Sequence, residues 1–373
     1  MTRHCSIILC TAVAALVALG LIMLTSTGAW VKGFGPYHFL CRQAWMVGIG
    51  LVAALVAARI PMEFFRKLVP WMFGGAVLLL VLCFVPGIAD PQYGSNRWIK
   101  VPLIGQFQPS EAAKIVIVLA ISAWFARWQT EVRTFWRGFV VPGLIAGIPI
   151  VLIAGETDVG TALSLSVAVG AILFCVGTRL LYALPSALAV VSGAAFYIYN
   201  NPNRWGRIEA WLDLENPVHQ LDRGMQQWRA LLALGNGGPW GVGLGNGVEK
   251  FGTLTFAHID FIFPVIGEEL GFVGVATVIV LYFWLTRRVF HIGRQAIALD
   301  RVFAGLMCQG IGIWIGFQAF INMGVNLGVL PTKGLTLPLM SFGGSAILMN
   351  LVALALVLRA DIENRALMRG GRS

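Results

Sequence analysis

Long apolar runs alternate with short polar segments along almost the whole chain. Ten of these runs are near the length of about 20 residues that an α-helix needs to cross the hydrocarbon core of a bilayer. They lie near residues 7–26, 39–58, 69–87, 110–127, 137–154, 159–177, 180–199, 264–286, 303–325 and 342–360. The pattern predicts an all-α, polytopic membrane protein with about ten transmembrane helices, and we expect residues 1–373 to form a single transmembrane domain.

The composition agrees with this prediction. Hydrophobic residues make up 58% of the 373 residues and charged residues only 12%, whereas about 25% is usual for a water-soluble domain. Most Lys and Arg residues fall in the short loops on the side that also carries both termini. Because such residues mark the cytoplasmic side, both termini are expected in the cytoplasm. The net charge of +10 is therefore mostly a topology signal, and no nucleic-acid partner is expected.

The longest segment between predicted spans, residues 200–263, separates the seventh span from the eighth and is expected outside the cytoplasm. Its first part alternates charged residues with tryptophan and leucine, which predicts amphipathic helices lying on the membrane. Its second part, 235–250, holds seven glycines in sixteen residues. A flexible linker and a loop that needs close backbone approach are both open readings of that part.

Two further outer segments carry polar residues where a span begins. Arg97, beside Trp98, follows the third span, and Glu111 and Lys114 lie three residues apart at the start of the fourth. An acid and a base at this spacing share one face of a helix, which suits either a structural salt bridge or a functional pair. Asp158 precedes the sixth span, and we expect it to cap that helix.

Asp260 is the strongest candidate for chemistry. Its neighbours are Ile259 and residues 261–263, all apolar. An isolated carboxylate among such residues is costly, so we expect it to face a polar cavity or a cation. Desolvation would raise its pKa, which suits a proton acceptor. Glu268 and Glu269 lie in the first turns of the next helix and are predicted to have mostly structural roles.

Asp260, the Glu111–Lys114 pair and several cations, Arg97, Lys250 and Lys333, all fall on the outer side of the predicted bundle. This constellation suits an anionic lipid-phosphate substrate whose reacting end lies outside the cytoplasm. The residues alone do not separate an enzyme from an anion transporter.

Five segments together resemble the SEDS (shape, elongation, division and sporulation) family. They are "NRWIKVPLIGQFQPSEAAKI", "TDVGTAL", "ALGNGGPWGVGLGNGVEK", "HIDFIFPVIGEELGFVG" and "PTKGLTLPLMSFGGSA". They run in family order from about residue 90 to 350. The last segment resembles the division branch more than the elongation branch, and a sporulation paralogue stays open.

The resemblance implies a peptidoglycan glycosyltransferase in the bacterial inner membrane that polymerises lipid II and releases undecaprenyl pyrophosphate. Asp260 is implied as the essential acid. Substrate-binding positions are implied or expected at Arg97, Glu111, Lys114, Lys250, Lys333 and Ser341. A divalent cation (Mg²⁺ or Mn²⁺) is expected, with Asp260 as a possible ligand, and no organic cofactor. The implied partners are a class B penicillin-binding protein and other membrane proteins of the division or elongation machinery.

The chain departs from the family pattern just before Asp260. Thr255 and Phe256 stand where the family usually has proline and glutamate, and "ETD" replaces "QPD" at 156–158. The first change leaves room for a scaffold that only activates a transpeptidase. A lipid II flippase is the other alternative, although we find no convincing inverted repeat of the kind that alternating-access transporters often show.

Overall fold

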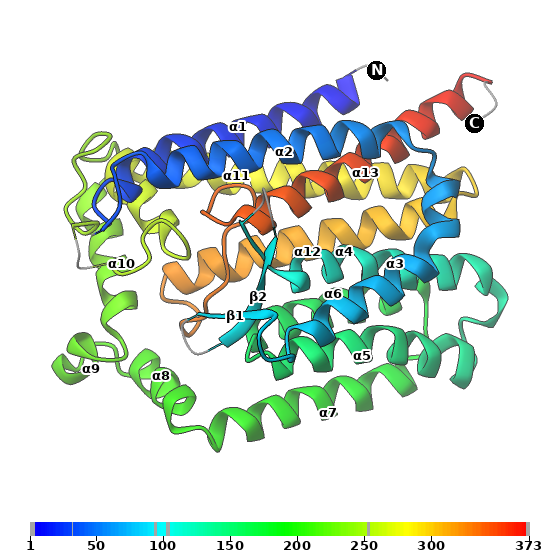
Figure 1. The fold of residues 1–373 in the computed structure, drawn as a ribbon, viewed down its shortest axis with the longest axis horizontal. Helices are drawn as coiled ribbons and strands as arrows, with labels where there is room; N and C mark the ends of the chain where they lie inside the picture. Colours follow the sequence, from blue (N-terminus) through cyan, green and yellow to red (C-terminus); the bar gives the residue numbers. More distant parts are fainter. Residues whose placement is uncertain (1–3, 32, 93–94, 102–104, 252–253, 371–373) are drawn as a thin grey trace.

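A computed structural model describes residues 4–31, 33–92, 95–101, 105–251 and 254–370. Its helices form an elongated bundle with both termini at one end (Figure 1). Ten of the described helices are long and apolar enough to cross a membrane, which confirms the predicted count. They are α1 (His4–Gly28), α2 (His38–Arg59), α3 (Met62–Leu82), α4 (Pro109–Arg127), α5 (Val141–Gly155) together with the π-helical turn before it, α6 (Val159–Val176), α7 (Leu180–Tyr199), α11 (Ile262–Ala298), α12 (Val302–Asn326) and α13 (Gly344–Met368).

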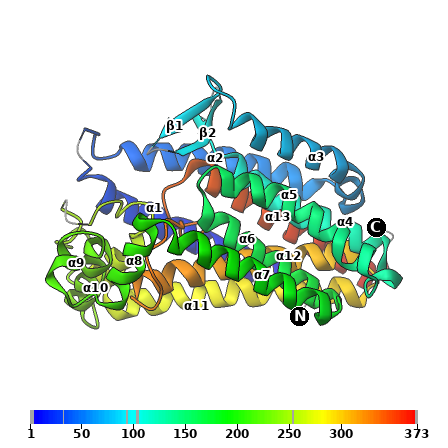
Figure 2. The ribbon, with the colours of Figure 1, turned by 90° about the horizontal axis from the view of Figure 1, so that it is seen from below.

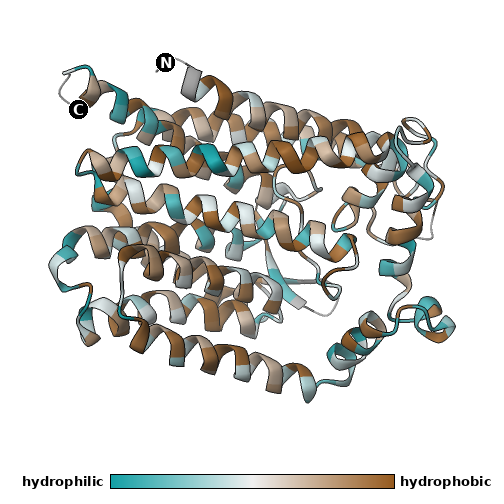
Figure 3. Ribbon diagram, turned by 180° about the vertical axis from the view of Figure 1, so that it is seen from behind, coloured by the Kyte–Doolittle hydropathy of each residue, from teal (hydrophilic) through white to brown (hydrophobic). Residues whose placement is uncertain are grey.

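Helices α4, α12 and α13 form the centre of the bundle, since most of their residues are buried. Helix α2 packs on α13, α3 on α4, and α1 and α12 on α11. Helix α7 lies at the edge and has no buried residue. Apolar residues follow the spans, and polar residues gather towards their ends (Figure 3). Short 3₁₀ and π segments, Gln129–Glu131 and Trp136–Val140, join α4 to α5.

Three predicted spans have wrong bounds. The third is predicted at 69–87, but α3 runs from Met62 to Leu82 and contains Pro70. Pro61 is the N-cap, and membrane helices tolerate a proline within the helix. The eighth is predicted at 264–286 and the tenth at 342–360, but α11 continues to Ala298 and α13 to Met368.

A small antiparallel sheet follows α3 and lies beside the bundle (Figure 1). We call the end of the bundle opposite the termini the site end. The sheet consists of β1 (Ala89–Gln92), β2 (Ser95–Val101) and β3 (Gly105–Phe107), in the order β1-β2-β3. Ile99 is the register partner of both Ala89 and Phe107. The all-α prediction missed this sheet because its strands are too short to show a hydrophobic alternation. The sheet carries Arg97 on its central strand.

Three helices lie in the long segment between α7 and α11, where the amphipathic pattern predicts helices. They are α8 (Pro202–Leu212), α9 (Pro217–Leu221) and α10 (Met225–Gly237). Figure 2 shows them gathered at the site end. The first two begin with asparagine N-caps, Asn201 and Asn216, each followed by proline.

Helix α11 is broken at Gly271, which has φ 67° and ψ −165°. The glycine-rich loop inserts its backbone at this break. The amides of Val242 and Gly243 donate to the carbonyls of Glu268 and Glu269, each at 3.0 Å, and the amide of Phe272 donates to the carbonyl of Gly238 at 2.9 Å. The loop therefore caps both halves of the helix.

Close approach requires glycine at position 241 of this loop. Gly241 has φ 80°, and a Cβ there would lie 2.2 Å from the carbonyl oxygen of Glu269. The glycine-rich segment is thus a tightly docked part of α11 and not a flexible linker.

We predict that Gly241→Ala destabilises the protein by about 1–3 kcal/mol, because the new methyl group combines strained backbone with a clash. The matched control is Gly235→Ala in α10, where a Cβ meets nothing within 4 Å. Thermal unfolding in detergent should show a lower midpoint for the first variant only. Equal midpoints for both would contradict the docking.

Candidate functional site

Asp260 lies in a tight turn that leads into α11. The carbonyl of Phe256 accepts hydrogen bonds from the amides of Ile259 at 2.9 Å and Phe261 at 3.4 Å. Phe256 has φ 62°, a left-handed conformation that is uncommon for a bulky residue. Asp260 as a residue is half-buried, and a Cβ on Gly334 would lie 3.2 Å from its Oδ2. The turn therefore presents the acid towards the segment that precedes α13.

Burial raises the pKa of Asp260 to about 7, although Arg97 lowers it and Asp158 raises it further. A carboxyl group with a pKa near the working pH can both accept and release a proton. The structure thus gives Asp260 the environment that its apolar neighbours predicted.

Arg97 and Asp158 form an ion pair beside Asp260. Nη1 of Arg97 lies 3.7 Å from Oδ2 of Asp158, and Nε2 of Gln108 donates to the same oxygen at 3.2 Å. The other carboxylate oxygen, Oδ1, accepts the amide of Thr161 at 3.1 Å and caps α6, as predicted. Sequence reasoning found the cap and missed the ion pair, because one carboxylate serves both.

Glu111 and Lys114 form the predicted salt bridge, with 2.8 Å between Oε1 and Nζ. Lys114 is almost fully buried, and its ammonium also contacts Oε1 of Gln318 at 3.3 Å and the ring of Trp314 at 4.7 Å. Oε2 of Glu111 has no hydrogen-bond partner among the described residues, and this side chain lines a cavity. Glu111 is therefore the member of the pair that a ligand can reach.

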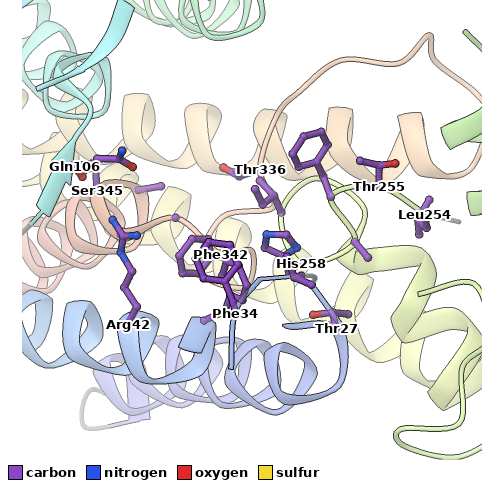
Figure 4. Close-up of a pocket in the computed structure, with 18 of the residues that line it drawn as sticks. Thr27, Phe34, Arg42, Gln106, Leu254, Thr255, His258, Thr336, Phe342 and Ser345 are labelled. Atoms are coloured by element: carbon purple, nitrogen blue, oxygen red, sulfur yellow. Dashed lines mark hydrogen bonds between the residues drawn. The ribbon is translucent and has the colours of Figure 1, made fainter. Parts of the chain in front are cut away.

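That cavity has a volume of about 1020 Å³ and opens beside the turn of Asp260 (Figure 4). The segment 254–259, which includes the unusual Thr255 and Phe256, forms one wall. Arg42 of α2 points into it near Gln106 (Figure 4). Its volume fits a large ligand with both apolar and polar parts.

His258 also lines the cavity, two residues before Asp260. Its ring lies 4.4 Å from Phe39 and 5.9 Å from Phe342. Burial lowers the pKa of His258 to about 4, so the imidazole is neutral at physiological pH. The ring joins the start of α2 to the turn of Asp260 without adding charge.

Lys250 and Ser341 are held in internal contacts. Nζ of Lys250 contacts Oε1 of Glu269 at 2.5 Å, Oγ of Ser26 at 2.6 Å and the carbonyl of Gly245 at 2.6 Å, and its side chain has no exposed area. Oγ of Ser341 accepts the amide of Leu337 at 2.8 Å and closes a turn. Substrate binding by these two residues stays a prediction. Lys250 borders the cavity, but the polar atoms of both side chains are already engaged in these contacts.

Glu268 and Glu269 hold the glycine-rich loop with their side chains. Oε1 of Glu268 accepts the amide of Val248 at 2.8 Å, and Oε2 of Glu269 accepts the amide of Gly245 at 3.0 Å. The structural role predicted for these two acids agrees with these contacts.

Lys333 differs from Lys250, because its ammonium has no ion-pair partner within the described ranges. Burial and the neighbouring cation Arg204 both lower the pKa of Lys333. Two cations near each other without an acid favour an anionic ligand. Of the cations predicted to bind substrate, Lys333 is the one whose surroundings fit that role best.

The described residues contain no group of three or more His, Cys, Asp or Glu side chains that could hold a metal ion. A closed, all-protein metal site does not fit this set. Mg²⁺ shared with substrate phosphates needs only one or two carboxylates, and Asp260 fits that more limited role.

These features define a ten-span membrane protein with a titratable acid and a large cavity at one end of the bundle. The family model described as "Cell cycle protein" (FTSW_RODA_SPOVE) matches residues 6–366. The chain belongs to this family, which confirms the SEDS resemblance.

Relatives and solved structures agree. A Burkholderia thailandensis protein named "Probable peptidoglycan glycosyltransferase FtsW" is 42% identical over 364 residues, covering 96% of this chain and 79% of that protein. A Nitrosomonas europaea protein of the same name is 41% identical, covering 98% and 94%. A chain from "Structural coordination of polymerization and crosslinking by a peptidoglycan synthase complex" has a TM-score of 0.77 at 30% identity, with 95% and 97% covered. The Thermus thermophilus rod shape determining protein RodA has a TM-score of 0.69 at 28% identity, with 95% and 96% covered.

We predict that Lys250→Met lowers stability by about 3–5 kcal/mol, because it leaves the buried carboxylate of Glu269 unpaired. Adding Glu269→Gln should recover part of this loss. The control is Arg66→Met, which breaks the exposed pair with Glu63 and should cost less than about 1 kcal/mol. Thermal unfolding measures all four proteins. An unchanged midpoint with weaker substrate binding would instead give Lys250 the predicted binding role.

Proposed function

We propose that this chain is a peptidoglycan glycosyltransferase of the division branch, which polymerises lipid II with Asp260 as general base. The observation that supports this most is the pKa of Asp260, raised to about 7 beside a cavity large enough for a lipid-linked sugar. The names of the relatives and the similarity to a chain of a peptidoglycan synthase complex support the same activity.

In the proposed reaction, the carboxylate of Asp260 accepts the proton of the 4-hydroxyl group of the acceptor sugar. The freed oxygen attacks the anomeric carbon of the donor sugar. The bond from that carbon to the lipid diphosphate breaks, and the diphosphate leaves with the bonding electron pair. Attack opposite the leaving group inverts the configuration at the anomeric carbon.

Cations near Asp260 are proposed to stabilise the leaving diphosphate, since fixed charges act strongly where water is excluded. Lys333 is best placed, because its ammonium has no acid partner among the described residues. Arg97 lies next to Asp260 but is shared with Asp158. Lys114 is buried and holds Glu111 in place through their salt bridge. A divalent cation would add further charge neutralisation at the diphosphate when bound.

The site end is proposed to face outward from the bacterial inner membrane, with both termini in the cytoplasm. The two termini lie at one end of the bundle, and the basic residues of short loops favour that end as cytoplasmic. A class B penicillin-binding protein is the proposed partner, because the similar synthase complex is described as coordinating polymerization with crosslinking.

We predict that Asp260→Asn lowers lipid II polymerisation by the purified protein with its partner about 10²–10⁴-fold, the contribution typical of a general base. The control is Asp222→Asn on an exposed acid, which should keep wild-type activity. Full activity of the Asp260 variant would reject the base and leave a scaffold or a flippase as the function.

The wild-type rate should fall as the pH drops through about 7. The raised pKa of Asp260 means that the carboxyl group becomes protonated there, and a protonated carboxyl group cannot accept the hydroxyl proton. A pH–rate profile measures this acidic limb. A rate that stays constant down to pH about 5 would contradict the assignment.

The orientation predicts opposite labelling of two exposed residues by a membrane-impermeant maleimide. In a cysteine-free background, Asn96→Cys on β2 should react in intact cells. Gln129→Cys, between α4 and α5, should react only after lysis. The reverse pattern would overturn the orientation.

A further inference from the structure

Three buried carboxamides form a row on one face of α12. They are Gln318, Asn322 and Asn326, spaced four residues apart, and each is at most 2% exposed. Residues four apart lie above one another on a helix. The row therefore faces the same two irregular segments, the turn of Asp260 and the segment before α13.

The row donates hydrogen bonds to backbone carbonyls of both segments. The side-chain Nδ2 of Asn322 donates to the carbonyl of Asp260 at 2.9 Å and to that of Leu335 at 2.6 Å, and Nδ2 of Asn326 donates to the carbonyl of Asp260 at 3.1 Å. Nε2 of Gln318 donates to the carbonyl of Thr336 at 2.9 Å. Carbonyl oxygens only accept hydrogen bonds, so the amide nitrogens must point towards them.

Two of the three side-chain oxygens connect the row to itself and to the buried lysine, whereas Oδ1 of Asn326 has no hydrogen-bond partner among the described residues. Oδ1 of Asn322 accepts from Nδ2 of Asn326 at 3.1 Å. Oε1 of Gln318 accepts from Nζ of Lys114 at 3.3 Å and from Nε1 of Trp314 at 3.0 Å. One rigid helix thus holds the backbone of Asp260, the backbone at 335–336 and the side chain of Lys114.

We propose that Asn322 and Asn326 are positioning residues for the reaction, and that they fix the carboxylate of Asp260 relative to the segment that carries Lys333. This inference rests on the proposed function. The carbonyl of Asp260 accepts two hydrogen bonds from α12, which fix the backbone of this residue. Within the described ranges, its carboxylate accepts no hydrogen bond of this kind. Lys333 lies two residues before Leu335, whose carbonyl the same Asn322 amide holds.

Positioning within a reaction requires tighter tolerance than folding does. A displacement of about 1 Å can lower a rate about 100-fold while leaving binding intact. Asn322→Gln keeps the carboxamide and moves it by one methylene group, so it tests placement separately from hydrogen bonding. Asn322→Leu and Asn326→Leu remove the donors altogether.

The matched control is Asn350→Leu in α13. Asn350 is 1% exposed, and its Oδ1 has no hydrogen-bond partner in the described part of the chain. It is a buried asparagine of a central helix that is not connected to Asp260. Its variant measures the general effect of replacing a buried amide by an apolar side chain.

The experiment measures kcat, KM and the pH–rate profile of lipid II polymerisation by the full chain with its partner, normalised to folded protein. We expect Asn322→Gln and Asn326→Leu to lower kcat at least about tenfold with KM changed less than about threefold. The acidic limb should move to lower pH, because a displaced Asp260 is less desolvated and Arg97 still lowers its pKa. Asn350→Leu should keep the wild-type limb and kcat within about threefold.

Wild-type kcat in the Asn322→Gln and Asn326→Leu variants would overturn the inference. An unmoved acidic limb together with a loss equal to that of Asn350→Leu would also overturn it, because only stability would then be affected. Neither outcome argues against Asp260 as the general base, provided that Asp260→Asn is inactive in the same assay. An active Asp260→Asn would instead reject the proposed function and the positioning with it.

Discussion

Backbone carbonyls and amides that lack a hydrogen-bond partner are too costly to leave unpaired at membrane depth, and this constraint determines how the site end is built. Helices satisfy their own backbone, but the turn at 256–261 and the segment 327–343 do not. Buried carboxamides from neighbouring helices supply the missing partners. Gln43 of α2 bonds the carbonyl of Ser341 and the amide of Gly343, and Gln227 of α10 bonds the carbonyls of Val325 and Leu330. Polar side chains in these helices therefore hold the irregular backbone on which the site depends.

Buried charges divide into two kinds by the same reasoning. Lys250 and Glu269 are closely paired and fully buried. Such a pair closes a structure and leaves little capacity for a ligand. Asp260 and Lys333 have no such pairing among the described residues, and burial shifts the pKa of each away from its charged form. The unpaired groups are those able to change partner during a reaction, so incomplete neutralisation marks the reactive part of the site.

The sequence predicted the parts of the structure that local patterns determine. Hydrophobic length predicted ten spans, Asp158 marked the start of α6, and the apolar neighbours of Asp260 indicated its environment. The ion pair of Arg97 with Asp158 could not be predicted, because 61 positions separate these residues in the chain and the pairing arises only when the sheet meets the end of α6. The role of Lys250 was equally hidden, since its partners come from α1 and α11. The amide row on α12 had a visible signal: polar residues repeating every four positions within an apolar span.

The glycine-rich loop behaves as part of a helix although its composition is that of a linker. Where α11 breaks, the carbonyls of Glu268 and Glu269 would have no hydrogen-bond donor from the helix. The amides of Val242 and Gly243 donate to them instead. Those two loop amides can exchange with solvent only when the break itself opens. Hydrogen exchange would therefore group residues 242–243 with the core of α11. The half-helix that follows Asp260 and the loop that caps it form one cooperative unit. Any motion that opens the loop therefore also loosens the first half of α11, which begins directly after the reactive acid.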